Sequence, residues 1–439
     1  MRTLKVDAQT ARRFLLGGQG LWPGRRWAGE RGVLDAVRQI GSIQVDPLNV
    51  VGHSQDLVLL SRVDGYRPEH LDQALYHQRT LFEWGGALNI RPIESLPYLL
   101  HKIRTADYLG RRALYERTHP DLVTKVLREV EARGPLGSRD LSGGTRVSSY
   151  RARRDTGLAL FYLWLRGDLM IHSRDAGDRV YDLTHRLIPP RFLEPAAAAD
   201  AESYLFRREM LLWGLPNSSE LLSVQRGSTL GPVRAGDRRG WVERQETAGR
   251  LARVQVAGWK GTSWVDGRDL PLLGTIQNGL IPKEWSPLAV GSVAEVTFLA
   301  PLEIVSARGR STRLFGYEYL WEVYKPPSKR RWGYYILPIL FEDTLVGRIE
   351  PVLDPKTGNL RVAQLWWERG IRPAELVEPM ARGLQRLAGY LAAPEIKLGD
   401  SISPSFREAL VREMRARQAD SKGLGGSRSR KVSKRVGFG

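Results

Sequence analysis

The chain has 439 residues, which is too many for a single hydrophobic core and indicates two to four domains. Hydrophobic residues make up 42% and charged residues 26%, an ordinary balance for a protein that folds. No apolar run is long enough to cross a bilayer, and the N-terminus lacks the apolar core of a secretion signal, so we expect a cytoplasmic location.

The net charge is strongly positive. Lys and Arg total 67 against 48 Asp and Glu, a formal charge of +19. Such an excess opposes compaction and is common where a polyanion supplies the counter-charge, so nucleic acid is the expected partner. A membrane is not expected as a partner, because no long basic amphipathic helix is visible. The alternative is that the charge serves solubility alone.

The chain contains no cysteine. This excludes iron–sulfur clusters, thiolate zinc sites, disulfides and a cysteine nucleophile. The seven histidines form no HxH, HxxxH or HExxH pair. We therefore expect neither a metal nor another cofactor.

The first predicted domain, residues 1–110, is an N-terminal winged-helix module. Asp7 is placed to cap a helix that runs through Leu16 and breaks at Gly17-Gly18. Val33, Val37 and Ile40 recur at helical spacing in a second helix that ends at Gly41, and a third helix is predicted from about residue 53 to 62.

A second predicted domain, residues 111–195, has the pattern of a winged helix. Helical spacing over 120–133 is followed by a short segment at 138–141 and by a third helix capped by Ser148 or Ser149. Two strands, 169–173 and 179–183, then flank a turn. Helix, short helix, helix and hairpin is the order of a winged helix, whose third helix normally enters the major groove.

Three arginines fall in the predicted first turn of that third helix: Arg151, Arg153 and Arg154. Cations at a helix N-terminus oppose the helix dipole, and a bound phosphate would reverse that penalty. We therefore expect these three residues to contact DNA. The alternative is a solvated face partly offset by Asp155.

Two further domains are predicted, at residues 196–285 and 286–395. The first has a helix over 202–213, a Ser218-Ser219 cap and glycine-punctuated strands, and is a third winged-helix candidate. The second has period-two segments at 313–324, 334–341, 345–352 and 360–368, followed by a helix over 373–391, which predicts an antiparallel meander. Its first turn carries Lys329, Arg330 and Arg331, which we expect to form a basic hairpin tip that contacts the DNA backbone.

Residues 396–439 are predicted to form a basic disordered tail. From residue 415 onward the sequence has eight Lys/Arg and one acid among Ser and Gly, a composition that buries no core. Such a tail raises nonspecific, salt-sensitive DNA affinity.

One segment, Gly41 to Val51, combines apolar and polar residues in a pattern that suits chemistry. If it is extended, Ile43 and Val45 point to one face while Gln44 and Asp46 share the other, about 6.5–7 Å apart. An amide and a carboxylate at that separation can hold a water molecule between them. The alternative is an ordinary amphipathic strand whose Asp46 starts a turn at Pro47.

This segment also carries a family resemblance. The residues Ile-Gly-Ser-Ile-Gln-Val-Asp-Pro-Leu-Asn-Val-Val (40–51), followed by Leu-Val-Leu-Leu-Ser-Arg (57–62), strongly resemble the YcaQ (AlkX) branch of the winged-helix DNA glycosylases related to AlkZ. Two further blocks agree with it: 313–335, from Arg-Leu-Phe-Gly-Tyr-Glu-Tyr to Lys-Arg-Arg-Trp-Gly-Tyr-Tyr, and 345–368, from Leu-Val-Gly-Arg-Ile-Glu to Leu-Trp-Trp-Glu. The resemblance spans residues 1 to about 395.

The resemblance implies an α+β fold of tandem winged-helix modules with a C-terminal antiparallel β-rich domain. It implies a monofunctional DNA glycosylase that excises N7-alkylated purines and unhooks interstrand crosslinks. The catalytic motif of this branch is Gln-apolar-Asp, which falls on Gln44 and Asp46. The expected partner is double-stranded DNA carrying alkylated or crosslinked purines, bound by a monomer that associates with the bacterial nucleoid.

One loop departs from the resemblance. Relatives commonly carry Ser-Pro-Phe-Asp ahead of an Asp-Arg or similar pair, whereas this chain has Ala-Pro-Leu-Glu at 300–303 and Ala-Arg-Gly-Arg at 307–310. If the loop probes the lesion, the range of substrates differs. Its basic residues complete the set of expected DNA contacts: Arg308, Arg310 and Arg313.

Two other classes of function compete with the glycosylase. A non-enzymatic binder, such as a transcription regulator or architectural protein, can use the same modules, because a fold does not decide function. A nuclease is disfavoured, because no acidic metal-binding cluster is visible in the sequence.

Overall fold

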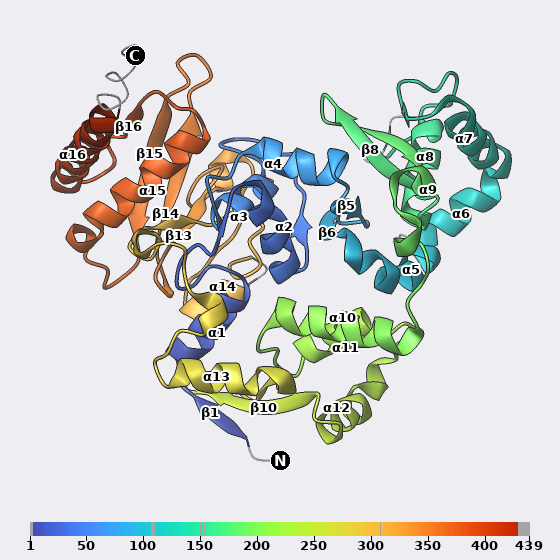
Figure 1. Ribbon diagram of the computed structural model, residues 1–439, viewed down its shortest axis with the longest axis horizontal. Helices are drawn as coiled ribbons and strands as arrows, with labels where there is room; N and C mark the ends of the chain where they lie inside the picture. The colour runs from blue at the N-terminus through green and yellow to red at the C-terminus, as the bar shows by residue number, and fades with distance from the viewer. Residues whose placement is uncertain (1–2, 107–109, 150–151, 153, 308, 429–439) are drawn as a thin grey trace, which may run out of the picture. The chain divides into compact units, whose positions relative to one another are not determined.

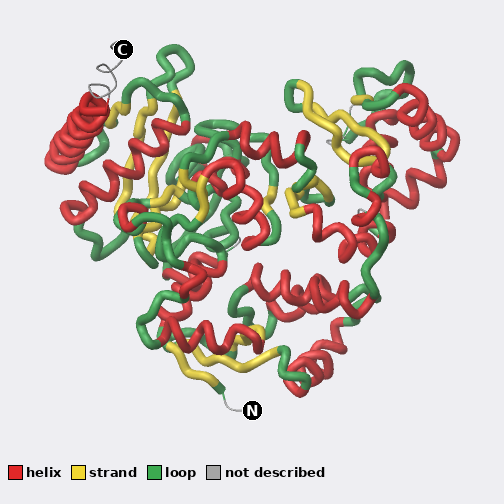
Figure 2. Tube along the Cα trace, viewed as in Figure 1, coloured by secondary structure: helices red, strands yellow, loops and turns green. Residues whose placement is uncertain are grey.

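The computed structural model describes residues 3–106, 110–149, 152, 154–307 and 309–428. Contacts divide the chain into two units, Met1–Leu48 with His53–Leu288 and Asn49–Gly52 with Ala289–Gly439. Each unit contains both helices and strands (Figure 2), so the predicted α+β class is confirmed. The finer division into four domains and a C-terminal tail stays a prediction. Within the described ranges no helix is both long and apolar enough to span a bilayer.

The first unit is rich in helices (Figure 1). Its α-helices are α1 (Ala8–Gly18), α2 (Gly29–Ile40), α3 (Ser54–Leu60), α4 (Pro68–Asp72), α5 (Leu96–Thr105), α6 (Arg111–Thr118), α7 (Pro120–Arg133), α8 (Asp155–Arg166), α9 (Thr184–Leu187), α10 (Ala198–Trp213), α11 (Glu220–Ser228), α12 (Arg238–Thr247) and α13 (Leu270–Gln277). Its strands are β1 (Leu4–Val6), β2 (Trp27–Ala28), β3 (Ile43–Gln44), β4 (Val63–Asp64), β5 (Leu81–Trp84), β6 (Asn89–Pro92), β7 (Leu136–Gly137), β8 (Leu169–Asp175), β9 (Asp178–Leu183), β10 (Leu251–Val256) and β11 (Ser263–Asp266).

These strands form small, separate sheets. Their orders are β2-β4, β3-β6-β5, β7-β9-β8 and β1-β10-β11. Strands β2 and β4 are parallel, as are β1 and β10, and the other pairs are antiparallel.

The three predicted N-terminal helices are confirmed as α1, α2 and α3, and the first two have strong end signals. The Asp7 carboxylate accepts a hydrogen bond from the Thr10 amide and caps α1. Gly41, with a φ of 85°, ends α2 and leads directly into β3. Val33 and Val37 are fully buried on the inner face of α2. The end of α2 thus fixes where the Gln44–Asp46 segment begins.

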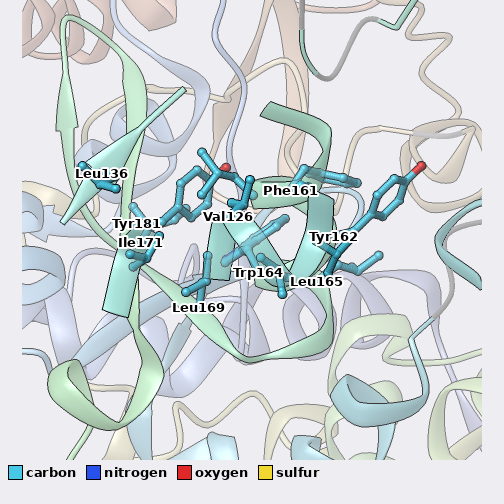
Figure 3. Close-up of a cluster of buried hydrophobic side chains, with 14 of the residues drawn as sticks. Val126, Leu136, Phe161, Tyr162, Trp164, Leu165, Leu169, Ile171 and Tyr181 are labelled. Atoms are coloured by element: carbon cyan, nitrogen blue, oxygen red, sulfur yellow. The ribbon is translucent and has the colours of Figure 1, made fainter. Parts of the chain in front are cut away.

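A hydrophobic core joins α7, α8 and the β7-β9-β8 sheet (Figure 3). Trp164 and Leu160 of α8 are fully buried, and Val126 and Val130 supply the inner face of α7. Fully burying side chains of this size is worth about 1.5–3 kcal/mol each. The packing places the β8-β9 hairpin against α8, in the order predicted for this segment.

Two predicted details of this region are wrong. Residues 138–141 form a turn instead of a short helix, because the Asp140 carboxylate accepts a hydrogen bond from the Gly137 amide at 2.7 Å. Helix α8 begins at Asp155 and not near Ser148. The Asp155 carboxylate accepts hydrogen bonds from the Thr145 and Thr156 amides, which fixes the start of the helix.

The second unit is built on one sheet of order β12-β13-β14-β15-β16. Its strands are β12 (Thr297–Phe298), β13 (Leu337–Phe341), β14 (Thr344–Leu353), β15 (Leu360–Trp367) and β16 (Ile396–Leu398). Its helices are α14 (Arg310–Phe315), α15 (Val377–Tyr390) and α16 (Pro404–Arg428). Neighbours in the sheet are antiparallel except β15 and β16, which α15 connects in parallel. The last three predicted strands and the predicted helix that follows them are confirmed.

The predicted strand over 313–324 is wrong. Gly309 and Gly316 have φ values of 77° and 64° and bound the short helix α14, which takes up the first part of this range. The residues after Gly316 alternate between buried and exposed, with Tyr317 and Tyr319 buried, but they pair with no described strand. The alternation reflects the burial of two tyrosines and not a sheet. The predicted basic hairpin is therefore absent.

The predicted disorder of residues 396–439 is also wrong where the chain is described. Residues 396–398 form β16, and α16 extends from Pro404 to Arg428. Phe406, Leu410 and Met414, spaced four residues apart, are buried, and α16 packs against α15. The composition beyond residue 415 hid this apolar stripe, which lies just before it. Residues 429–439 lie outside the described part of the chain.

Candidate active site

The Gln44–Asp46 segment lies at one edge of the β3-β6-β5 sheet. In register, Gln44 is opposite Asn89 of β6, and Asn89 is opposite Trp84 of β5. All three side chains are partly exposed. Residues that are directly opposite each other in an antiparallel sheet share a face, so these side chains form a row across the three strands.

The other face of this sheet is buried. The adjacent row of directly opposite residues points to this face. It consists of Ile43, Ile90 and Glu83, and each is at most 4% exposed. The Val45 amide donates to the Leu88 carbonyl at 2.9 Å, and the Val45 side chain packs against the hydrophobic core of the α7–α8 region. The extended path therefore continues to Val45, and the shared face of Gln44 and Asp46 stays a prediction from alternation.

The Asp46 carboxylate is held by a local turn. Its Oδ1 accepts a hydrogen bond from the Leu48 amide at 2.9 Å, as in a turn that begins at Pro47. Its Oδ2 has no hydrogen-bond partner among the described residues. The Asp46 amide in turn donates to Oε1 of Gln55, in the first turn of α3, at 3.2 Å. Asp46 therefore starts a turn, as the ordinary interpretation expected, and still keeps one oxygen available.

Buried and partly buried hydrogen bonds anchor this sheet to α8 and β8. The Trp84 indole donates to the Leu165 carbonyl at 3.0 Å, and the Trp164 indole donates to the Glu83 carbonyl at 3.1 Å. Arg174 of β8 donates to the buried Glu83 carboxylate at 2.9 Å and to the Tyr76 hydroxyl at 3.1 Å. Burial alone lowers the pKa of Arg174, but Glu83 and Tyr76 outweigh that effect and the pKa is raised. The sheet that carries Gln44 is thus rigidly supported.

The arrangement suits hydrolysis by water. A carboxylate accepts a proton or stabilises a nearby positive charge, and an amide both donates and accepts hydrogen bonds. Within the described residues, no three His, Asp or Glu side chains are grouped in a way that could hold a metal ion. A cavity of about 620 Å³ lies elsewhere in the first unit, between α1, α10 and α13, and neither Gln44 nor Asp46 lines it.

A comparison with protein families identifies the chain. The model of the family described as "DNA glycosylase AlkZ-like" matches residues 37–392, most of the sequence. The chain belongs to the AlkZ-like DNA glycosylase family. It is therefore a DNA glycosylase, an enzyme that acts in DNA repair.

A solved structure supports the same fold. The DNA glycosylase AlkZ of Streptomyces sahachiroi matches with a TM-score of 0.58, at 16% sequence identity, over 90% of this chain and 99% of that chain. At this identity the likeness concerns the fold alone. The mixed helical and stranded architecture of this glycosylase is thus similar to that of AlkZ.

The DNA contacts predicted near α8 are only partly described. Arg154 is exposed and directly precedes the helix, and its guanidinium donates to the Gly143 carbonyl at 3.3 Å. It is the N-cap residue of α8 and not part of the first turn, but it still lies at the positive end of the helix dipole. Arg151 and Arg153 lie outside the described residues.

The predicted contacts of the second unit differ in exposure. Arg310 is only 5% exposed, so its guanidinium is not presented to a duplex and we leave it out of the proposed contacts. Arg313 is partly exposed, and Lys329 and Arg331 are exposed. Arg308 lies outside the described residues.

A buried carboxylate orders the basic loop of the glycosylase. Glu322 accepts hydrogen bonds from the Lys325 ammonium and from the amides of Arg331 and Trp332, all at 2.8–2.9 Å. Burial raises its pKa, but these bonds outweigh burial and lower the pKa to about 2. Arg330 donates to the Lys325 carbonyl. The loop thus presents Lys329 and Arg331 from a fixed backbone.

Sequence reasoning missed two residues at the site. Gln55 holds the backbone of Asp46 from a different element, and Asn89 reaches Gln44 only through the pairing of β3 with β6. Neither lies within the motif, and strands as short as these give no periodic signal. The one available signal was the turn-forming Gly85-Gly86 after an apolar run, which marks a hairpin but not its partner strand.

Proposed function

We propose that this glycosylase hydrolyses the N-glycosidic bond of N7-alkylated purines, with Asp46 and Gln44 as its catalytic residues. The observation that supports this most directly is the state of Asp46. One carboxylate oxygen and the backbone amide are held in place, while the second oxygen makes no hydrogen bond with the described residues. A carboxylate fixed in this way is available for a substrate on the face that it shares with Gln44.

The proposed substrate class is the one that the family resemblance implies, and the residues of the site suit it. An N7-alkylated purine is cationic, so it leaves as a neutral base and needs little help from a general acid. The bond between C1′ and N9 breaks with its electrons moving to the purine ring, and the sugar develops an oxocarbenium-like charge. Asp46 stabilises that charge and accepts the proton of the water that bonds to C1′. Gln44 positions this water.

The same chemistry extends to interstrand crosslinks that join guanines through N7. Each such guanine is cationic before cleavage and departs from its sugar as a neutral base, so cleavage of one glycosidic bond unhooks the crosslink. Direct attack by water involves no amine nucleophile, and we therefore propose a monofunctional enzyme without lyase activity.

Duplex DNA is the proposed partner, bound by winged-helix modules in the first unit. The region with α7, α8 and the β8-β9 hairpin is the best candidate, because it keeps the order of helix, helix and wing. The proposed backbone contacts among the described residues are Arg154, Arg313, Lys329, Arg330 and Arg331. Arg151, Arg153 and Arg308 stay in the proposal on the sequence alone.

The test is base release from duplex DNA that carries N7-methylguanine, and unhooking of a nitrogen-mustard crosslink. We expect wild type to act on both, Asp46→Ala to lose activity, and Gln44→Ala to lose most of it. Borohydride should trap no covalent complex. Release that survives Asp46→Ala contradicts the mechanism, and no release by wild type from either substrate contradicts the substrate class.

A further inference from the structure

Asn89 lies closer to Gln44 than its distance in sequence suggests. It begins β6, the central strand of the β3-β6-β5 sheet, directly opposite Gln44. The bond from the Val45 amide to the Leu88 carbonyl makes Gln44 and Asn89 a non-hydrogen-bonded pair. In such pairs the Cα atoms are only about 4.5 Å apart and the side chains lie closest to each other.

The Asn89 carboxamide is available for a ligand. The residue is partly exposed, on the same face as Gln44, and its side chain makes no hydrogen bond with the described residues. It is flanked on its other side by Trp84, whose indole is occupied by the Leu165 carbonyl. Solvent can satisfy the hydrogen-bonding groups of an asparagine on a sheet surface. The position of Asn89 beside the proposed catalytic motif also suits its carboxamide to bind a ligand there.

The turn that leads into Asn89 is strained. Leu88 has a φ of 43°, a left-handed conformation that is unfavourable for a residue of this size, and its side chain is buried. Such conformations cost about 1–3 kcal/mol and occur where the surrounding structure imposes them, often at functional sites. Here the Leu88 carbonyl accepts from Val45, so the strained residue is the one that sets the register of Gln44 against Asn89.

We propose that Asn89 is a third polar residue of the site and positions the attacking water together with Gln44. Ordered waters in proteins make about three hydrogen bonds on average. Gln44 and Asp46 supply two, and the Asn89 carboxamide supplies the third from the neighbouring strand. This inference rests on the proposed function, and it assigns a role to β6 that the motif itself does not contain.

The test compares single-turnover base release with DNA affinity in the intact protein. Asn89→Ala is expected to slow base release from N7-methylguanine DNA by about 10- to 100-fold, while the Kd for the same DNA changes less than about twofold. Asn89→Val, which suits a strand and has no hydrogen-bonding group, is expected to behave in the same way. Asn278→Ala, a change at the exposed end of α13, is the matched control and should match wild type.

A double-mutant cycle tests the shared water. If Gln44 and Asn89 hold the same molecule, Gln44→Ala combined with Asn89→Ala should be little slower than the slower single variant. Effects that multiply would contradict a shared water, and wild-type rates in both Asn89 variants would overturn the proposal while leaving the proposed function intact. An inactive wild-type protein would overturn the proposed function and this inference together.

Discussion

Asp46 uses its two carboxylate oxygens differently. Oδ1 closes the turn at Leu48, and Oδ2, which makes no hydrogen bond with the described residues, is the oxygen that the proposed mechanism uses. If Asp46 only formed a turn, its substitution by Asn or Ser would cause no loss of function. The charge on Oδ2, rather than the turn, is therefore what the proposed mechanism requires.

Gln55 lies outside the motif, and its hydrogen bond with the Asp46 amide can be tested by mutation. Gln55→Ala removes the acceptor of the Asp46 amide and leaves the carboxylate less precisely placed. We expect base release to fall by about 10-fold, with DNA affinity unchanged, since small displacements of a catalytic group slow the chemical step. Single-turnover rates and Kd values for the same duplex measure the two effects separately, and an equal loss in both would contradict a positioning role.

The lowered pKa of Glu322 predicts how the stability that this residue contributes changes with pH. Its pKa, lowered to about 2, lies below the ordinary value of 4.5, so the ionised group stabilises the fold above about pH 4.5. That stability is lost as the pH falls toward 2. With allowance for screening by solvent, Glu322→Gln should cost about 1–2 kcal/mol at pH 7 and much less at pH 3.

Melting temperatures of Glu322→Gln and wild type across this pH range measure the difference. Glu318→Gln, in the same segment but with an exposed carboxylate, is the control. A gap between Glu322→Gln and wild type that stays constant with pH would contradict the role of the Glu322 charge.

At the scale of elements, the sequence predicted what local signals specify. The Asp7 cap and the glycine that ends α2 identified their helices, and α15 and the strands from β13 to β15 were recognised from their periodicity. Elements that depend on distant partners were missed or mistaken. The 313–324 segment alternates because two tyrosines are buried, and α16 is held by a stripe that packs on α15.

The residues of the candidate site also divide into those that the local sequence predicts and those that it does not. The resemblance predicts Gln44 and Asp46 as the motif, and alternation predicts that they share one face. The pairing of β3 with β6, which brings Asn89 to that face, depends on a register between segments more than 40 residues apart, and no local pattern encodes it.

The ion pair between Glu83 of β5 and Arg174 of β8 can be tested by mutation. Arg174→Met leaves the Glu83 carboxylate buried without its cation and should destabilise the protein by about 2–4 kcal/mol. Replacing both residues, in Glu83→Met with Arg174→Met, should recover much of that loss, because no charge then stays buried. Thermal or urea denaturation measures this, and a double variant as unstable as the sum of the singles would contradict the pairing.

At the scale of the whole molecule, the charge of +19 predicts strong salt dependence of DNA binding. Residues 429–439 carry four Lys/Arg and no acid. Deleting them should make the dependence of log Kd on log salt concentration less steep, by up to about 4. Binding titrations at several salt concentrations measure the slope, and the base-release rate at saturating protein should not change. An unaltered slope would show that the tail does not contact DNA.

Asp46→Asn tests directly whether Asp46 acts in the chemical step. Asparagine keeps an oxygen for the Leu48 amide, so the turn is retained while the charge is lost. We predict that Asp46→Asn binds N7-methylguanine DNA with wild-type affinity and melts at the wild-type temperature, but releases base at least about 100-fold more slowly in single-turnover assays. Base release by Asp46→Asn at a rate near that of wild type would contradict the account.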